Sequence, residues 1–161
     1  MWGISPLLSK FLLTRRASII SIFISLRYSS SSNLLMAEHK YLNVAKRFFD
    51  AYNASDTSTI TEVVDTDLLW AHSNRFKGQG RDALLKSIKE YSANVPGRAF
   101  SAPARWAVNE NVLFLEHKWE GVPTIDVPGF GWKAGTRASL DCLSVLVFDG
   151  EDRIVEWTDY A

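Results

Sequence analysis

The sequence predicts an α+β domain, in which a curved, mixed but mostly antiparallel sheet wraps around N-terminal helices like a cone. Apolar residues at helical spacing are confined to the first half of residues 36–161, and long strand candidates follow one another in the second half. Helices that come first and strands that come later indicate α+β rather than alternating α/β. The length of this segment suits one hydrophobic core, so we expect a single domain.

Residues 1–35 differ in composition from the rest of the chain. They hold four basic side chains, no acidic one and many serines. A basic, serine-rich, acid-free leader is typical of a mitochondrial transit peptide, so we expect a mitochondrial protein. The apolar stretch 17–26 leaves a secretory signal open, and a cytoplasmic product that begins at Met36 is the third possibility. The apolar stretches are interrupted by basic residues, so no membrane span is expected.

Charge and cysteine content exclude several classes of function. The 161 residues include 18 Lys and Arg and 18 Asp and Glu, a formal net charge of zero, which argues against a nucleic-acid-binding surface. Cys142 is the only cysteine, so neither an intramolecular disulfide nor a cysteine-only zinc site is possible. The histidines at 39, 72 and 117 have no close ligand spacing, and no metal is expected.

Three helices and a short strand pair are expected first. Apolar residues recur at helical spacing through 38–53. Asp56 is placed to cap a short helix that runs to about Val64, because its carboxylate can accept hydrogen bonds from free backbone amides. A short strand over 68–72, then a turn and strand within 75–80 and a third helix over 81–91 complete this half.

Four long strands are expected in the second half, over residues 99–108, 111–121, 136–148 and 153–160. Asn109-Glu110 and Asp149-Gly150 are typical of tight turns between strands. Prolines and glycines in 123–135 indicate a loop, and its Gly129-Phe130-Gly131 segment is a candidate to close over a ligand.

Strand alternation predicts which side chains share a face. Trp70 and His72 fall on one face of the first strand. His117 and Trp119 share a face of their strand, as do Trp157 and Asp159 on the last one. On the strand between, Cys142 and Ser144 alternate with residues such as Leu143, Val145 and Val147.

Three segments resemble domains of the nuclear transport factor 2 like superfamily. They are residues 44–53 followed by Asp56, residues 78–83 (GQGRDA), and the final hairpin 148–160. The hairpin is similar to that of the SnoaL-like branch, which includes polyketide cyclases, limonene-epoxide hydrolases and relatives of ketosteroid isomerase. The resemblance implies a cystatin-like α+β barrel with a pocket at its open end, no cofactor and a homodimer. It places Trp70, His72, His117, Trp119 and Asp159 on the concave side.

The family's catalytic positions carry over only in part. The water-binding arginine and aspartate of limonene-epoxide hydrolases fall at His117 and Trp119, while their second acid matches Asp159. The proton-transferring aspartate of ketosteroid isomerases falls at His72. Their oxyanion-binding tyrosine falls at Phe48, which cannot donate, and their oxyanion aspartate falls near Ser144. Tyr52, one helical turn after Phe48, is an alternative donor.

We therefore expect a small-molecule enzyme that acts by acid–base chemistry without a cofactor. His72 is the expected base, Asp159 the expected acid, and His117 the group that polarises a substrate oxygen. The expected substrate-binding residues are Trp70, Trp119, Trp157, Tyr52 and Ser144. The substrate class is an apolar, oxygenated molecule, and the reaction an isomerisation, cyclisation, dehydration or hydration.

The alternatives follow from the same residues. Because Phe48, Trp70 and Trp119 replace catalytic groups of the family, a non-catalytic module that binds a hydrophobic ligand or dimerises is the second hypothesis. Asp159 has a purely structural alternative, an ion pair with a basic residue such as Arg137. Apolar residues at outward strand positions agree with the implied homodimer.

Overall fold

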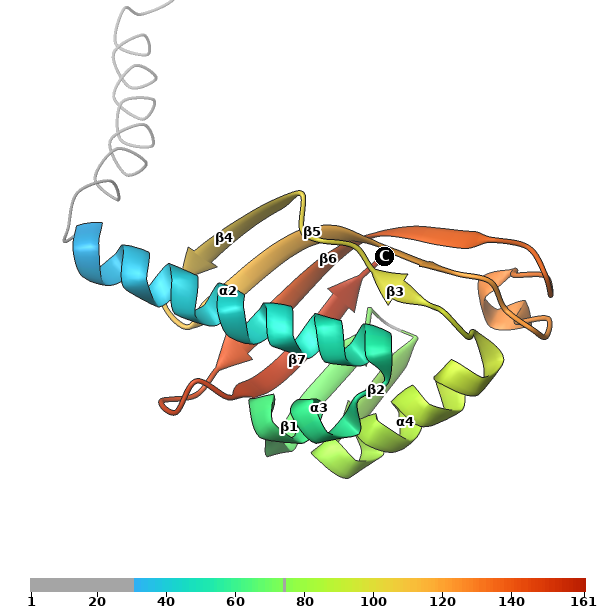
Figure 1. Cartoon of the computed structure of the whole chain (residues 1–161), viewed down its shortest axis with the longest axis horizontal. Helices are drawn as coiled ribbons and strands as arrows, with labels where there is room; N and C mark the ends of the chain where they lie inside the picture. The colour runs from blue at the N-terminus through green and yellow to red at the C-terminus, as the bar shows by residue number, and fades with distance from the viewer. Residues whose placement is uncertain (1–30, 74) are drawn as a thin grey trace, which may run out of the picture. The chain divides into compact units, whose positions relative to one another are not determined.

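Figure 1 shows a computed structural model of the chain, which describes residues 31–73 and 75–161. Residues 37–161 form one unit, distinct from residues 1–36. The expected transit peptide, residues 1–35, lies almost entirely outside the described residues, so mitochondrial import stays a prediction. None of the helices in the described part combines the length and the apolar character needed to cross a membrane.

The first described helix, α2 (Ser31–Ala54), supplies several large aromatic side chains of the core. Ala45, Phe48, Phe49 and Tyr52 recur at helical spacing and are buried, which confirms the expected inward stripe. The helix ends where Ser55 adopts a left-handed backbone conformation, with a φ of 57°.

Two shorter helices follow. In α3 (Thr57–Val63) the Asp56 carboxylate accepts hydrogen bonds from the Ser58 and Thr59 amides, as predicted. Helix α4 (Arg81–Asn94) extends three residues beyond the expected end and buries Leu84 and Ile88.

Seven strands form one mixed sheet in the order β2-β1-β7-β6-β5-β3, with β4 also paired to β5. Only β1 and β7 pair in parallel; the other pairings are antiparallel. The bounds are β1 Val64–His72, β2 Phe76–Gln79, β3 Ala99–Phe100, β4 Arg105–Asn109, β5 Val112–Gly121, β6 Ala138–Phe148 and β7 Ile154–Tyr160. A short 3₁₀ turn, η2 (Pro128–Phe130), lies in the expected loop. The predicted α+β class and mostly antiparallel sheet are confirmed.

Two strand predictions were wrong in extent. Strand β1 begins at Val64, four residues earlier than expected, directly after α3. The strand expected over 99–108 is broken into β3 and β4. Phe100 pairs with Trp119 and Arg105 with Glu116, so four residues stand opposite two. This interruption contains Pro103, which has no N–H to donate to a sheet ladder.

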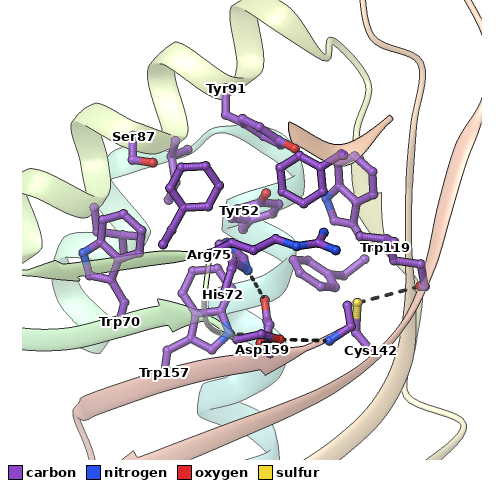
Figure 2. A pocket seen from close by; sticks show the side chains of 18 of the residues that line it. Tyr52, Trp70, His72, Arg75, Ser87, Tyr91, Trp119, Cys142, Trp157 and Asp159 are labelled. Carbon is purple, nitrogen blue, oxygen red and sulfur yellow. Dashed lines mark hydrogen bonds and ion pairs between the residues drawn. The ribbon is translucent and has the colours of Figure 1, made fainter. Parts of the chain in front are cut away.

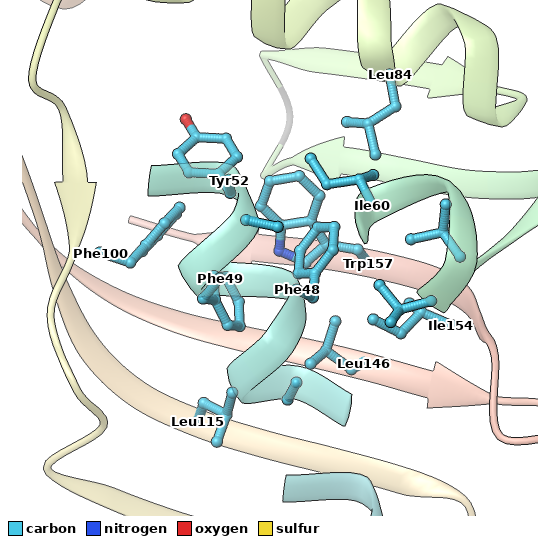
Figure 3. Close-up of a cluster of buried hydrophobic side chains, with 14 of the residues drawn as sticks. Phe48, Phe49, Tyr52, Ile60, Leu84, Phe100, Leu115, Leu146, Ile154 and Trp157 are labelled. Atoms are coloured by element: carbon cyan, nitrogen blue, oxygen red, sulfur yellow. The ribbon is translucent and has the colours of Figure 1, made fainter. Parts of the chain in front are cut away.

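The core lies between the concave face of the sheet and α2. Figure 3 shows Trp157 of β7 at its centre, and this residue is 1% exposed. It contacts Phe48 and Tyr52 of α2, with ring centroids 5.0 and 5.9 Å away, and Phe100 at 6.3 Å. The last strand is therefore fixed against the first helix by aromatic packing.

Gly78 of β2 has no side chain, and the Trp70 indole of the neighbouring strand packs directly against its backbone. The two residues are cross-strand partners, and a Cβ added to Gly78 would lie 2.6 Å from Trp70 Nε1, inside van der Waals contact.

We predict that Gly78→Ala displaces Trp70 and lowers the free energy of unfolding by about 1–3 kcal/mol, the usual cost of overpacking. Chemical denaturation of the two proteins measures this. Coincident unfolding curves would contradict the claim that the Trp70 indole occupies the space of a side chain at position 78.

Candidate functional site

A cavity of about 260 Å³ opens between the concave face of the sheet and helix α4 (Figure 2). Its volume is near the lower end of that of small-molecule sites, roughly 300–1,000 Å³. Aromatic rings make up much of its wall, and these are Tyr52, Trp70, Phe76, Tyr91, Phe100, Trp119, Phe130, Trp132 and Trp157. The cavity therefore suits a ligand with a largely apolar body.

Strand register brings the polar residues of the site into one row. His72 of β1 is the parallel partner of Asp159 on β7, and Asp159 is the antiparallel partner of Ser144 on β6. Two residues earlier on both strands, and so on the same face, Trp70 of β1 pairs with Trp157 of β7. Residues far apart in the sequence thus become neighbours because the first strand lies beside the last.

Asp159 is a buried carboxylate whose two oxygens have different surroundings. Its side chain is 2% exposed. Oδ1 accepts hydrogen bonds from Ser144 Oγ and from Trp157 Nε1, the latter at 2.8 Å. Oδ2 makes no well-aligned hydrogen bond, and the His72 Nδ1 atom lies 3.3 Å from it. The carboxylate is thus oriented through Oδ1 and directs Oδ2 to the imidazole.

His72 connects this carboxylate to the open part of the cavity. Its side chain is 36% exposed and packs edge-on against Trp157, with ring centroids 5.4 Å apart. With Nδ1 directed to Asp159, Nε2 makes no hydrogen bond to any described residue. An imidazole with one nitrogen beside a carboxylate and the other open to the cavity is suited to accept and return a proton.

His117 and Ser144 lie behind the cavity wall rather than on it, which corrects the sequence-based picture. Both occupy the expected face of their strands, but neither borders the cavity. The His117 ring is enclosed by Phe49 and Phe100, with centroids 4.8 and 4.6 Å away. His117 therefore does not reach a ligand oxygen directly, and Ser144 is not positioned to bind one.

These two residues instead support Asp159. The His117 Nε2 and Ser144 Oγ atoms are 2.7 Å apart, and the Ser144 hydroxyl donates to the carboxylate. Since that hydroxyl has one proton, it accepts from His117, whose Nε2 must carry hydrogen. Burial lowers the pKa of His117, and this effect exceeds that of the Asp159 charge, which raises it. The ring is therefore neutral at pH 7.

The four aromatic residues expected to bind substrate all border the cavity: Trp70, Trp119, Trp157 and Tyr52. Burial raises the pKa of Tyr52, so its hydroxyl keeps its proton and stays a donor. The alternative partner for Asp159, Arg137, instead pairs with Glu120.

Sequence reasoning named the Gly129-Phe130-Gly131 segment as a candidate to close over a ligand, but it did not place Trp132 or Arg75 at the cavity. Phe130 and Trp132 of the expected loop fold back onto the cavity, where their rings stack at 4.5 Å, and Trp132 stacks on Trp119 at 5.1 Å. Two glycines flanking an aromatic residue were the available signal. No sequence pattern around Arg75, which lies in the turn between β1 and β2, indicated a role at the cavity. Cys142 also borders the cavity, but burial and the Asp159 charge raise its pKa to about 12, so its thiol is inert.

No group of three or more His, Cys, Asp or Glu side chains is arranged to hold a metal ion within residues 31–73 and 75–161.

The chain was compared with protein families and with known proteins. A family model described as SnoaL-like domain matches residues 45–157. A search of curated proteins finds no match.

Several solved structures share the fold. An LEH-like epoxide hydrolase of M. tuberculosis has a TM-score of 0.63 and 16% identity, over 76% of this chain and 82% of that one. Bal32a from a soil-derived mobile gene cassette has a TM-score of 0.62 and 18% identity, over 76% and 89%. A protein with a ketosteroid isomerase-like fold from Catenulispora acidiphila, in complex with trimethylamine, has a TM-score of 0.62 and 13% identity, over 73% and 84%. The resemblance found in the sequence is thereby confirmed.

The buried, neutral His117 generates a prediction about stability and pH. Because its folded-state pKa is lowered, the unfolded chain binds more protons below the unperturbed pKa of about 6.5, and folding weakens as pH falls from 7 towards 5. We expect His117→Gln to reduce this dependence by up to about 1.4 kcal/mol per pH unit. Thermal or denaturant unfolding at several pH values measures it, and identical pH profiles would contradict the burial argument.

Proposed function

The chain belongs to the SnoaL-like domain family, and from that membership and the site's geometry we propose an acid–base enzyme that needs no cofactor. The supporting observation is that the His72 imidazole, open to an apolar cavity, lies 3.3 Å from an oriented, buried Asp159 carboxylate. The proposed substrate is a small oxygenated molecule with an apolar body, which the aromatic wall accommodates.

In the proposed mechanism, His72 Nε2 takes a proton from an acidic C–H or O–H of the substrate. The Asp159 carboxylate stabilises the imidazolium that forms and holds the ring in place. The imidazolium then returns the proton to a different substrate atom, so that no net proton is gained or lost. A single dyad serves as base and then acid, in contrast to the separate acid predicted at Asp159.

This chemistry is compatible with isomerisation, cyclisation, dehydration or hydration. One structural neighbour is an LEH-like epoxide hydrolase, but its 16% identity supports the fold alone. The arginine–aspartate pair implied by that resemblance falls here at His117, behind the wall, and Trp119. Epoxide opening by that pair is therefore not proposed.

The dyad is tested by proton exchange and turnover. We propose incubation with a panel of aromatic ketones, enones and epoxides in D₂O, followed by NMR for exchange and for products. With a responsive compound, His72→Gln and Asp159→Asn should each lower the rate by about 10²–10⁴-fold, the usual contribution of a positioned acid–base group. Asp141→Asn, the same change at an exposed position of β6, is the matched control and should leave the rate unaltered.

Unchanged rates in both dyad variants would reject the mechanism. A hydrophobic compound that co-purifies and is recovered unchanged after incubation, as seen by mass spectrometry, would instead support the non-catalytic binding module.

We also propose that the protein forms a homodimer through the outer face of the sheet. Leu143 and Tyr160 are cross-strand partners on that face, and they are 41% and 54% exposed. Val145 and Val147 lie on the same face of β6, in line with Leu143. Exposed apolar residues grouped on one sheet face are typical of an interaction surface.

Sedimentation measures this directly. We expect the mass of two protomers for the unmodified protein and of one protomer for Leu143→Lys, because a lysine there would place a charge in the interface. A single-protomer mass for the unmodified protein would exclude the dimer.

A further inference from the structure

We propose that Arg75 makes the cavity selective for a ligand that carries a carboxylate beside its apolar body. This inference rests on the proposed function and specifies its substrate class. Arg75 lies in the turn between β1 and β2 and borders the cavity.

The turn that carries Arg75 is fixed to the catalytic strands. The Arg75 amide donates to the His72 carbonyl at 3.0 Å, and the Ser73 amide donates to the Asp159 carbonyl. Figure 2 shows the Arg75 side chain extended across the cavity near His72. Its Cζ lies 4.7 Å from the Phe130 ring centroid, a cation–π contact that holds the guanidinium at the aromatic wall.

The charge of Arg75 has no carboxylate partner among the described residues. By contrast, four exposed or partly exposed arginines each pair with at least one acid, and these are Arg47, Arg105, Arg137 and Arg153. A cation that borders a cavity and is held by an aromatic ring instead of an acid is available to an anionic ligand.

A second cation lies behind the helix side of the cavity. Arg98 is 2% exposed, and its Cζ lies 4.4 Å from the ring centroid of Tyr52, a cavity residue. It donates to the backbone carbonyls of Tyr52 and Ile88 and pairs with no acid in the described part of the chain. Arg98 does not border the cavity, but it places a second positive charge against the Tyr52 ring of the cavity wall.

A monoanionic carboxylate fits this environment better than a phosphate. Asp159 and Glu90 also border the cavity, so a dianion would meet more repulsion. The planar guanidinium matches the two oxygens of a carboxylate. The Phe130 and Trp132 rings offer a surface for the apolar body. Because Arg75 is three residues from His72 in one turn, an anchored carboxylate also orients the ligand beside the imidazole.

Cinnamate and its neutral isostere cinnamamide provide a matched pair of probes. We expect isothermal titration calorimetry at pH 7.5 to show cinnamate binding at least tenfold more tightly than cinnamamide. In Arg75→Gln this preference should fall to within about twofold, and Arg75→Lys should retain part of it because the charge remains. Lys77→Gln is the control, since it removes an equal charge at an exposed residue of β2 that does not border the cavity.

Equal affinities for the two probes, no detectable cinnamate binding at millimolar concentration, or a preference unchanged in Arg75→Gln would each overturn the proposal. The measurement involves binding only. If the dyad proves non-catalytic, the preference for cinnamate and its dependence on Arg75 still show whether Arg75 selects a carboxylate ligand.

Discussion

The parallel pairing of β1 with β7 is the constraint on which the rest of the site depends. It is the only parallel pairing among the described strands, and it sets His72 opposite Asp159. The two residues are far apart in the sequence, since even Ser73, which follows His72, is 86 positions before Asp159. A slip of one residue would turn every side chain of β1 to the other face and remove the imidazole from the cavity. The hydrogen bonds from Ser73 to the Asp159 carbonyl help to fix this register.

Trp157 couples the stability of the core to the geometry of the site. Its ring is buried among the aromatic side chains of α2, while its indole N–H donates to the Asp159 carboxylate. A buried carboxylate is costly unless hydrogen bonds compensate for its lost hydration. Trp157 and Ser144 supply those bonds on one oxygen, and His117 supports Ser144 from behind. The polar network explains why a charged group is retained in a largely aromatic interior.

The sequence was sufficient for the features that depend on local pattern. Strand alternation put Trp157 and Asp159 on one face, and the family resemblance put His72 and Asp159 on the concave side, where all three border the cavity. The Asp56 cap followed from side-chain chemistry alone. Alternation gives the face of a residue but not its depth. His117 was therefore expected on the cavity surface, whereas the rings of Phe49 and Phe100 cover it.

Features that depend on long-range contacts were beyond sequence reasoning. The contact between His72 and Asp159 requires the first strand to lie beside the last, which no local pattern specifies. The loop with Phe130 was expected to close over a ligand, but the contacts that hold it were not foreseen. Phe130 stacks on Trp132, Trp132 stacks on Trp119, and the Arg75 guanidinium lies over the Phe130 ring. These are contacts between a loop, a turn and a strand that fold onto one another.

A crystal structure with a bound aromatic carboxylate is the most direct test of the His72–Asp159 dyad. We expect His72 Nδ1 to remain against Asp159 Oδ2 and Nε2 to lie within about 2.6–3.2 Å of a ligand atom that can exchange a proton. An imidazole turned away from Asp159, or a ligand seated out of reach of Nε2, would contradict the dyad as the reacting group.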